Sequence, residues 1–333
     1  MSVRLTIDAP GAPGLQRVLV TGANGFVGRA LCAELGAQGV AVTALTRDEC
    51  EVAGAGEVRA VGDFTAIEDW RPWLADVDAI VHLAALTHDG TRGADGARFH
   101  AVNVEVSRAL ATAALACDIR RFVYMSSIKV NGESSSRATG VMHACSGADT
   151  PAPEDDYGRS KLAAEQALAA LWQDASGALT ILRPPLIYGP GQQGNLPRLM
   201  KLITRGVPLP FGAVTNQRSL IYVDNLVSAT VRALGIANRG VRCYTLADVD
   251  ISTPELVRAL AHALGVRANL INVPAPWLRA LARLPVIGDR MRRLTDSLLA
   301  DARAIENELA WTPRVEFEQA LAITCAAWRA ERP

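Results

Sequence analysis

The chain has 333 residues, half of them apolar, and its 34 Lys and Arg residues balance 34 Asp and Glu residues. This length accommodates one large α/β domain, or a domain with a smaller lobe, in a soluble globular protein. Nucleic acid is not an expected partner, because binding it needs a concentrated basic surface.

Membrane insertion and export are also not expected. No apolar run approaches the ~20 residues that a transmembrane helix requires, so we expect no integral membrane segment. Residues 1–16 contain Asp8, Pro10 and Pro13 where a signal peptide would need an apolar core, which favours a cytoplasmic location. The six cysteines show no close pairing and no metal-ligand spacing, so we expect neither structural disulfides nor a metal site.

Short apolar segments rich in Val, Ile and Leu alternate with longer helical segments in the first half of the chain. Continuous apolar strands separated by helices are what a parallel sheet covered on both faces requires, which predicts an α/β, doubly wound fold. The expected strands are 18–20, 42–45, 79–83, 122–125 and 180–182, and the expected helices are 25–38, 99–116 and 157–173.

The pattern loosens after Pro185, where proline and glycine cluster. A strand and a helix return at about 220–234, and residues from Thr253 onward are mostly helical. We therefore expect a smaller, mostly helical C-terminal lobe that supplies the substrate side of a cleft. The predicted division is a Rossmann domain at 15–185 with about 220–248, and a substrate lobe at 186–219 and 249–333.

A segment near the C-terminus, Pro276 to Leu294, combines leucines with five arginines. It is compatible with a helix lying on a membrane surface. We favour the alternative of a lobe helix with a solvated basic face.

A glycine-rich turn follows the first expected strand and opens the first expected helix. Glycines at this position let the backbone approach a pyrophosphate at the helix N-terminus. The alternative is a tight turn that holds no ligand. The turn residues that we expect at a dinucleotide are Gly22, Asn24, Gly25, Phe26, Val27 and Gly28.

The end of the second expected strand indicates which dinucleotide binds. An acidic residue there accepts hydrogen bonds from both ribose hydroxyls, whereas a basic residue pairs with a 2′-phosphate. The chain has Arg47 at this point and no carboxylate until Asp48. We therefore favour NADP over NAD, with the alternative that Arg47 is an ordinary surface charge.

Three polar residues form a candidate catalytic group. Tyr157 and Lys161 are four residues apart, which puts phenol and ammonium on one face of a helix. A tyrosine holds its proton at pH 7, so a nearby positive charge is needed to lower its pKa into a useful range. Ser127, just after the expected strand 122–125, is placed to hydrogen-bond a substrate oxygen.

With these motifs the chain resembles an extended short-chain dehydrogenase/reductase of the nucleotide-sugar epimerase/dehydratase family from Val18 to Trp328. The resemblance implies that Ser127, Tyr157 and Lys161 are the catalytic triad and that Asn103 orders a proton relay. The matching segments are the glycine turn, 82–85, Asn103, 126–127, 157–161, 183–190, 218–224 and 308–313.

The resemblance also implies binding residues. Asp63 would reach the adenine amino group, and His82 is interpreted as a structural histidine. Asn195 and Arg218 would hold a nucleoside diphosphate, and Phe211 lies in the loop that covers the uracil; Asn195 alternatively caps a helix. The remaining expected dinucleotide contacts are Phe64, Leu83, Ala84, Ala85, Tyr157, Lys161 and Pro184.

One departure from the family pattern excludes one of the family's reactions, dehydration. In its 4,6-dehydratases an Asp-Glu pair follows the catalytic hydroxyl, whereas this chain has Ile128 and Lys129. Isoleucine cannot carry a proton, so we expect no dehydration by that mechanism. Residues 127–133 instead resemble a UDP-glucose 4-epimerase-like bacterial subgroup, some of whose members reduce a 4-keto sugar during surface-polysaccharide assembly.

The predicted function is redox chemistry at C4 of a UDP-hexose or UDP-N-acetylhexosamine, as a 4-keto reductase or a 4-epimerase, with Arg47 favouring the reductase. One alternative is an NADPH-dependent reductase of a non-sugar carbonyl, such as a steroid or flavonoid ketone. Another is a non-catalytic dinucleotide sensor on the same fold. Homodimers are common in the family, and a UDP-sugar is the expected small-molecule partner.

Overall fold

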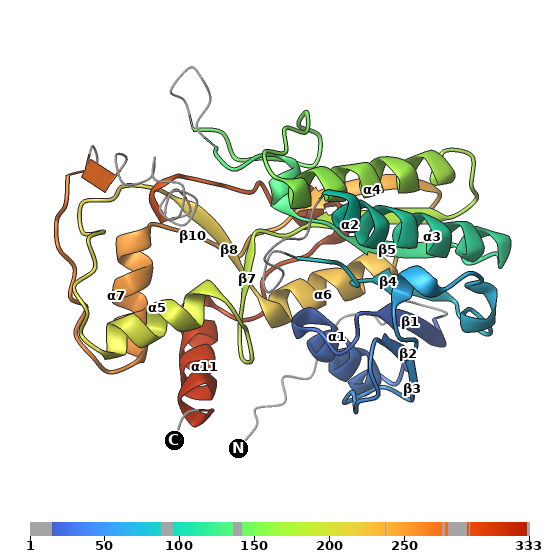
Figure 1. Ribbon diagram of the computed structural model, residues 1–333, viewed down its shortest axis with the longest axis horizontal. Coiled ribbons are helices and arrows are strands. Elements are labelled where there is room, and N and C mark those ends of the chain that lie inside the picture. The colour runs from blue at the N-terminus through green and yellow to red at the C-terminus, as the bar shows by residue number, and fades with distance from the viewer. Residues whose placement is uncertain are drawn as a thin grey trace.

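A computed structural model describes residues 15–87, 96–135, 142–236, 238–274, 277–278, 292 and 294–331 (Figure 1). The segment Pro276 to Leu294 lies almost entirely outside these residues. Within the described part of the chain, no helix has both the length and the apolar character needed to cross a membrane.

A seven-stranded parallel sheet forms the larger part of the molecule (Figure 1). Its strand order is β3-β2-β1-β4-β5-β6-β9. Because β1 pairs with both β2 and β4, the order reverses there, and ligands of such sheets bind at the strand ends beside that point. The strands are β1 Arg17–Thr21, β2 Ala41–Thr46, β3 Glu57–Ala60, β4 Ala79–His82, β5 Arg121–Met125, β6 Ala178–Arg183 and β9 Gly240–Thr245.

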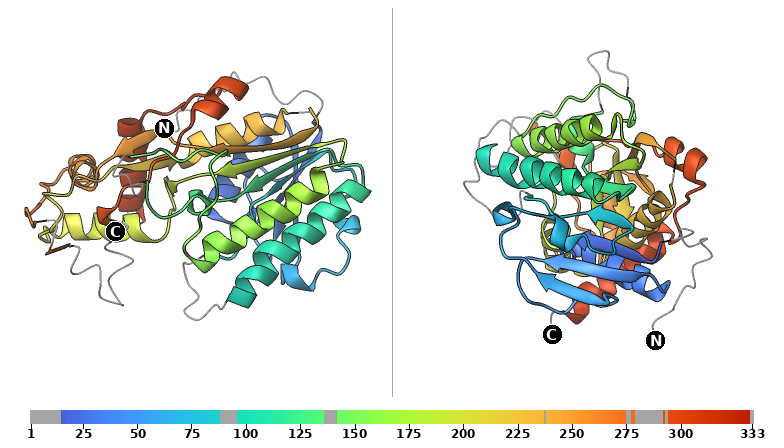
Figure 2. Two further views of the ribbon diagram at one scale, coloured as in Figure 1. Left: turned by 90° about the horizontal axis from the view of Figure 1, so that it is seen from above. Right: turned by 90° about the vertical axis from the view of Figure 1, so that its right-hand side faces the viewer.

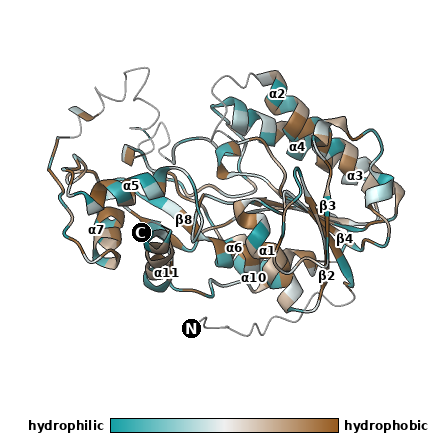
Figure 3. Cartoon of the chain, turned by 60° about the horizontal axis from the view of Figure 1, so that its bottom comes forward, coloured by the Kyte–Doolittle hydropathy of each residue, from teal (hydrophilic) through white to brown (hydrophobic). Residues whose placement is uncertain are grey.

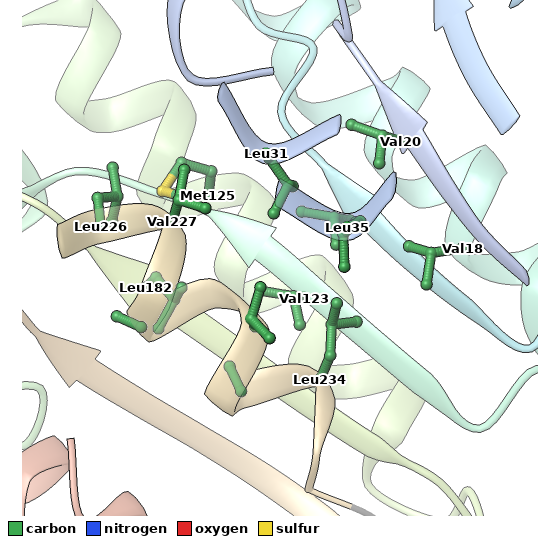
Figure 4. Packing of buried hydrophobic residues seen from close by; sticks show 14 of the residues in the cluster. Val18, Val20, Leu31, Leu35, Val123, Met125, Leu182, Leu226, Val227 and Leu234 are labelled. Carbon is green, nitrogen blue, oxygen red and sulfur yellow. The ribbon is translucent and has the colours of Figure 1, made fainter. Parts of the chain in front are cut away.

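Helices cover both faces of this sheet (Figures 1 and 2). Successive side chains of β1 serve opposite faces: Val18 and Val20 join one apolar cluster, and Leu19 joins the other. The first cluster lies under α1 (Phe26–Ala37) and α6 (Val223–Leu234), as Figure 4 shows, and the second under α3 (Val106–Ala116) and α4 (Asp156–Trp172). The predicted doubly wound fold is confirmed.

One expected helix is interrupted. The segment predicted as a single helix over 99–116 consists of α2 (Gly96–His100), a π turn (Ala101–Glu105) and α3. The wide turn carries the buried Asn103, whose side chain hydrogen-bonds outside its own helix. A π turn at such a position is typical of functional sites, and sequence periodicity does not reveal it.

The remaining part of the chain builds a smaller body around a third apolar cluster. Its helices are α5 (Asn195–Thr204), α7 (Thr253–Ala263) and α11 (Phe317–Ala330). It also holds a three-stranded sheet in the order β10-β8-β7, of which only β8 was expected. Figure 3 shows α5 with a hydrophilic outer side, opposite the buried Leu196, Met200 and Ile203. The three strands are β7 Leu186–Tyr188, β8 Arg218–Tyr222 and β10 Val249–Ile251.

A late segment returns to the large sheet. Ile305, on α10 (Arg303–Leu309), and Trp311 pack into the cluster under α1 and α6. The Trp311 indole also donates a hydrogen bond to Ser228 Oγ at 2.9 Å. The 308–313 motif therefore anchors the C-terminal region on α6.

Candidate active site

The glycine turn packs directly against the end of β4. Gly22 has a φ of +65°, and a Cβ there would lie 2.9 Å from the Ala84 nitrogen. A Cβ on Gly28 would lie 2.3 Å from the Gly22 carbonyl oxygen. Both positions therefore require glycine, because no side chain fits between these backbones.

The N-terminus of α1 suits a bound diphosphate. Gly25 is its N-cap and supplies no side-chain acceptor, and no acidic residue lies in the first turn. The first N–H groups of a helix have no partner within the helix, and the helix dipole favours negative charge there. The residues of this turn thus fit the pyrophosphate of a dinucleotide.

His82 has a structural position beneath this turn. Its Nδ1 lies 2.6 Å from Thr21 Oγ1, and its Nε2 lies 2.9 Å from Ser107 Oγ. Thr21 Oγ1 in turn accepts hydrogen bonds from the N–H groups of Leu83 and Ala84, each at 3.2 Å. Burial lowers the pKa of His82 to about 3, so the ring is neutral and ties β1 to β4.

The residues expected at the adenosine end come together at the ends of β2 and β3. Arg47 is exposed directly after β2, and its carbonyl accepts a hydrogen bond from Gly62 at 3.0 Å. Asp63 accepts from the N–H and the hydroxyl of Thr65, which lowers the pKa of its carboxyl, and Arg98 and Arg47 lower it further. Phe64 stacks on Trp70 with ring centroids 6.1 Å apart.

Ser127 and Tyr157 meet across two elements. Ser127 follows β5 and caps a short 3-10 turn, Ile128–Val130, where its hydroxyl accepts from the Lys129 N–H at 3.3 Å. Tyr157 lies in the first turn of α4, and its phenol lies beside the Ser127 side chain. Burial raises the pKa of Tyr157 to about 12, and the Ser127 hydrogen bond opposes that rise.

Lys161 lies one turn after Tyr157 and is buried. Its ammonium donates to the Met125 carbonyl at 2.7 Å and lies 4.7 Å from the centroid of the Tyr124 ring. Burial lowers the pKa of Lys161 to about 7, and the Glu165 carboxylate raises it. The predicted triad therefore occupies one site, with a cation on the tyrosine's face of α4.

Asn103 lies behind this site. Its amide group donates to the Leu86 carbonyl at 3.1 Å and to Ser160 Oγ at 2.9 Å, and its Oδ1 accepts from the Leu86 N–H at 2.7 Å. Asn103 thus connects the loop after β4 to α4. The proton-relay role remains a prediction.

A buried ionic network, which was not expected from the sequence, joins α4 to the ends of β5 and β6. Arg183, at the end of β6, forms two hydrogen bonds to Glu165 of α4, at 2.9 and 2.5 Å, with both side chains 5% exposed. Ser126 also donates to Glu165, and Arg183 reaches Asn131 at 3.1 Å. Glu165 lies one helical turn after Lys161, so the helical spacing alone could have identified it. Its partner, Arg183, is 18 residues further along the chain and could not be identified in this way.

Pro184 links the cofactor side to the lobe. Its carbonyl accepts from the Ile128 N–H at 3.0 Å, beside Ser127. In the parallel pairing of β7 and β8, Leu186 is opposite Leu220, which brings Arg218 toward the level of Pro184. Arg218 donates to the Asp296 carbonyl at 3.1 Å.

The other two substrate residues lie elsewhere in the lobe. Asn195 is exposed and is the first residue of α5, whose N-cap is Gly194 with a φ of 103°. The alternative that Asn195 caps this helix is therefore wrong, because the chain enters the helix one residue earlier through a glycine conformation. Phe211 is 6% exposed and belongs to the lobe's apolar cluster, and its contact with uracil remains a prediction.

Comparison with known proteins places this geometry in a family. Residues 18–245 match the NAD dependent epimerase/dehydratase family. The chain is 34% identical over 323 residues to the UDP-glucose 4-epimerase of Vibrio cholerae, covering 93% of this chain and 95% of that protein. It is 33% identical over 267 residues to the 2-alkyl-3-oxoalkanoate reductase of Stenotrophomonas maltophilia (strain K279a), covering 75% and 76%.

A solved structure has the same architecture. MoeE5 in complex with UDP-glucuronic acid and NAD superposes with a TM-score of 0.76 at 27% identity, over 95% of this chain and 99% of that one. The glycine turn, Ser127, Tyr157 and Lys161 all lie within the residues that match the family. The chain is therefore an enzyme and belongs to the NAD-dependent epimerase/dehydratase family of extended short-chain dehydrogenases/reductases.

Proposed function

We propose that this enzyme performs redox chemistry at C4 of a UDP-hexose or UDP-N-acetylhexosamine, with NADP as its cofactor. The observation that supports the proposal is that the Tyr157 phenol lies beside the Ser127 side chain, with the buried Lys161 ammonium one turn away on the same helix. The nicotinamide supplies or accepts the hydride. Tyr157 exchanges the proton of the C4 oxygen, and Ser127 hydrogen-bonds that oxygen.

The charges around Tyr157 suit this role. A half-buried phenol with a pKa of about 12 holds its proton at neutral pH, which suits proton donation to a forming alkoxide. The positive charges of Lys161 and of an oxidised nicotinamide favour the phenolate, which suits the reverse direction. Both directions of hydride transfer are therefore served by one site.

Two outcomes fit this chemistry. A 4-epimerase oxidises C4, lets the keto sugar turn over and returns the hydride to the other face, so its cofactor stays bound. A 4-keto reductase consumes reduced cofactor in each turnover. Arg47, exposed at the end of β2, favours the reductase, since pairing with a 2′-phosphate selects the NADP pool. Assembly of a surface polysaccharide is the proposed use of the product.

Dehydration is not part of the proposal. Ile128 is buried and carries no proton, and the Lys129 ammonium is ion-paired with Asp155 and Glu133. Neither of the two residues after Ser127 is an Asp or a Glu, so the chain lacks the carboxyl pair that assists this elimination.

Mass spectrometry of the nucleotide released from freshly purified, denatured protein tests the cofactor and the reaction together. Traces of NADP, or a site emptied by exchange, would support a reductase. Stoichiometric NAD would instead support a self-contained epimerase and contradict the role of Arg47.

A second candidate is reduction of a non-sugar carbonyl. Its support is the likeness to the 2-alkyl-3-oxoalkanoate reductase, which spans three quarters of this chain. Arg218 favours the nucleotide sugar, because a guanidinium matches the geometry of a diphosphate. Calorimetry with UDP separates the two: saturable binding that weakens in Arg218→Met supports the UDP-sugar, and no binding supports the second candidate.

A further inference from the structure

Lys129 forms an ion pair between the turn that Ser127 caps, Ile128–Val130 (the Ser127 turn), and the residue that caps α4. Its ammonium pairs with the Asp155 carboxylate and lies 2.7 Å from Glu133 Oε1. The Lys129 side chain is only 18% exposed, so this pair is largely shielded from water. Lys129 is two residues after Ser127, and Asp155 is two residues before Tyr157.

Backbone contacts reinforce the same junction. Asp155 is the N-cap of α4, and its Oδ1 accepts from the Gly158 N–H at 2.7 Å. A Cβ on Gly158 would lie 2.8 Å from the Lys129 carbonyl oxygen, so the turn and the helix pack without space for a side chain. Ala152 also donates to the Val130 carbonyl at 3.0 Å.

We propose that Lys129 is a positioning residue that, by pairing with Asp155, holds the Ser127 turn against the first turn of α4 and neutralises the carboxylate beside Tyr157. The distance between the two catalytic hydroxyls depends on this junction, because Ser127 and Tyr157 come from different elements. A shift of either element by about 1 Å in such a site costs on the order of 100-fold in rate.

The charges that face Tyr157 give this role an electrostatic signature. The Asp155 carboxylate raises the pKa of Tyr157, and a cation paired with that carboxylate offsets its field. On α4, Lys161 is a buried cation, and Arg159 pairs with Asp156 at 2.7 Å. From α2, the uncharged ring of Phe99 faces Tyr157, with ring centroids 6.4 Å apart. Of the further charges near the site, Glu165 pairs with Arg183, and Glu133 shares the Lys129 ammonium with Asp155.

The test is a titration of Tyr157 that does not need a substrate. The chain has five tyrosines, and burial raises the pKa of each of them. In the NADP-bound, ¹³Cζ-tyrosine-labelled protein, the Tyr157 signal is assigned by its loss in Tyr157→Phe.

Four proteins are compared in this titration. Lys129→Met should raise the Tyr157 midpoint by roughly half to one pH unit, as expected for one uncompensated charge at a partly buried site. Asp155→Asn, which retains a capping oxygen, should lower it, and the double variant should return it toward wild type. Equal midpoints in wild type and Lys129→Met, or no fall in Asp155→Asn, would overturn the proposal.

Two further variants separate position from charge. Lys129→Arg should restore the wild-type midpoint. Glu133→Gln should change it less than Asp155→Asn does, because Asp155, and not Glu133, raises the pKa of Tyr157. If Lys129→Met does not fold, Asp155→Asn alone decides the electrostatic claim. The pH–rate profiles of these variants should shift in the same order as their Tyr157 midpoints, and this expectation rests on the proposed function. If no UDP-sugar is turned over, the proposed function is wrong, but the titration of Tyr157 still tests the role of Lys129.

Discussion

Lys161 donates a hydrogen bond of 2.7 Å to the backbone carbonyl of Met125, which joins α4 to the end of β5. Met125 is two residues before Ser127, so this bond sets the distance between the strand that ends in the serine and the helix that carries Tyr157. It also holds the ammonium at a buried place where the field of a cation is weakly screened. Because Lys161 lies one turn after Tyr157, it both fixes the position of α4 against β5 and places a cation on the tyrosine's face of the helix.

Replacing Tyr157 by phenylalanine should remove the proton donor and leave the fold intact. The ring retains its edge contact with Phe99, so the melting temperature should change little. General acid–base catalysis contributes roughly 10²- to 10⁴-fold, and kcat should fall by that factor. Steady-state assays with NADPH measure it, and a variant that keeps most of its activity would rule out the proton role.

Gly28→Ala should impair dinucleotide binding, because the new Cβ would lie 2.3 Å from the Gly22 carbonyl and 2.7 Å from Ala23. Gly96→Ala is the matched control, since a Cβ there meets no atom within 4 Å. Calorimetry with NADP and thermal unfolding check both variants. Equal affinity in Gly28→Ala and wild type would contradict the close packing of this turn.

Arg47→Ala should weaken the binding of NADPH and leave the binding of NADH unchanged. Loss of a charge-assisted bond to the 2′-phosphate should raise the KM for NADPH roughly tenfold to a hundredfold. Arg71→Ala, which removes an exposed arginine paired with Asp69, serves as the control. If Arg47→Ala changes the KM for NADPH no more than the control does, the preference for NADP is wrong.

His82 should make the protein lose stability in acid. Burial lowers its pKa from 6.5 to about 3, so between these values the unfolded state binds a proton that the folded state does not. The contribution is complete above pH 6.5 and is lost as the pH falls toward 3, by up to about 1.4 kcal/mol per unit. Urea unfolding of wild type and His82→Gln at several pH values should give a shallower pH dependence for the variant. Exposed His100, changed to Gln, should leave the wild-type slope, and parallel slopes in all three proteins would refute the assignment.

Glu165→Gln should destabilise the protein by about 3–5 kcal/mol, since it leaves the buried Arg183 guanidinium without its counter-ion. Changing Arg183 to methionine as well should recover part of the loss. Denaturant unfolding measures both, with exposed Glu68→Gln as the control. If Glu165→Gln lowers the free energy of unfolding no more than Glu68→Gln does, the Glu165–Arg183 pair does not stabilise the site.

Much of the fold could be predicted because its strands are continuous apolar runs. The helix 157–173 was predicted to within a residue. The glycine turn and the Tyr157–Lys161 pair could be predicted because their spacing is local, and Ser127 because it follows an apolar strand. The pairs Glu165–Arg183 and Lys129–Asp155 could not be predicted, because their partners are far apart in sequence and meet only through tertiary packing. The π turn at Asn103 depends likewise on hydrogen bonds to Leu86 and Ser160.

The central claim is hydride transfer to C4 of a UDP-linked sugar. Incubation of the enzyme with deuterated NADPH, carrying the label on the transferred position, and a UDP-4-keto-hexose tests it directly by NMR and mass spectrometry of the product. We expect a UDP-hexose with deuterium at C4, formed in wild type and absent in Tyr157→Phe. A product without label at C4, or no product from 4-keto forms of UDP-hexoses and UDP-N-acetylhexosamines, would contradict it.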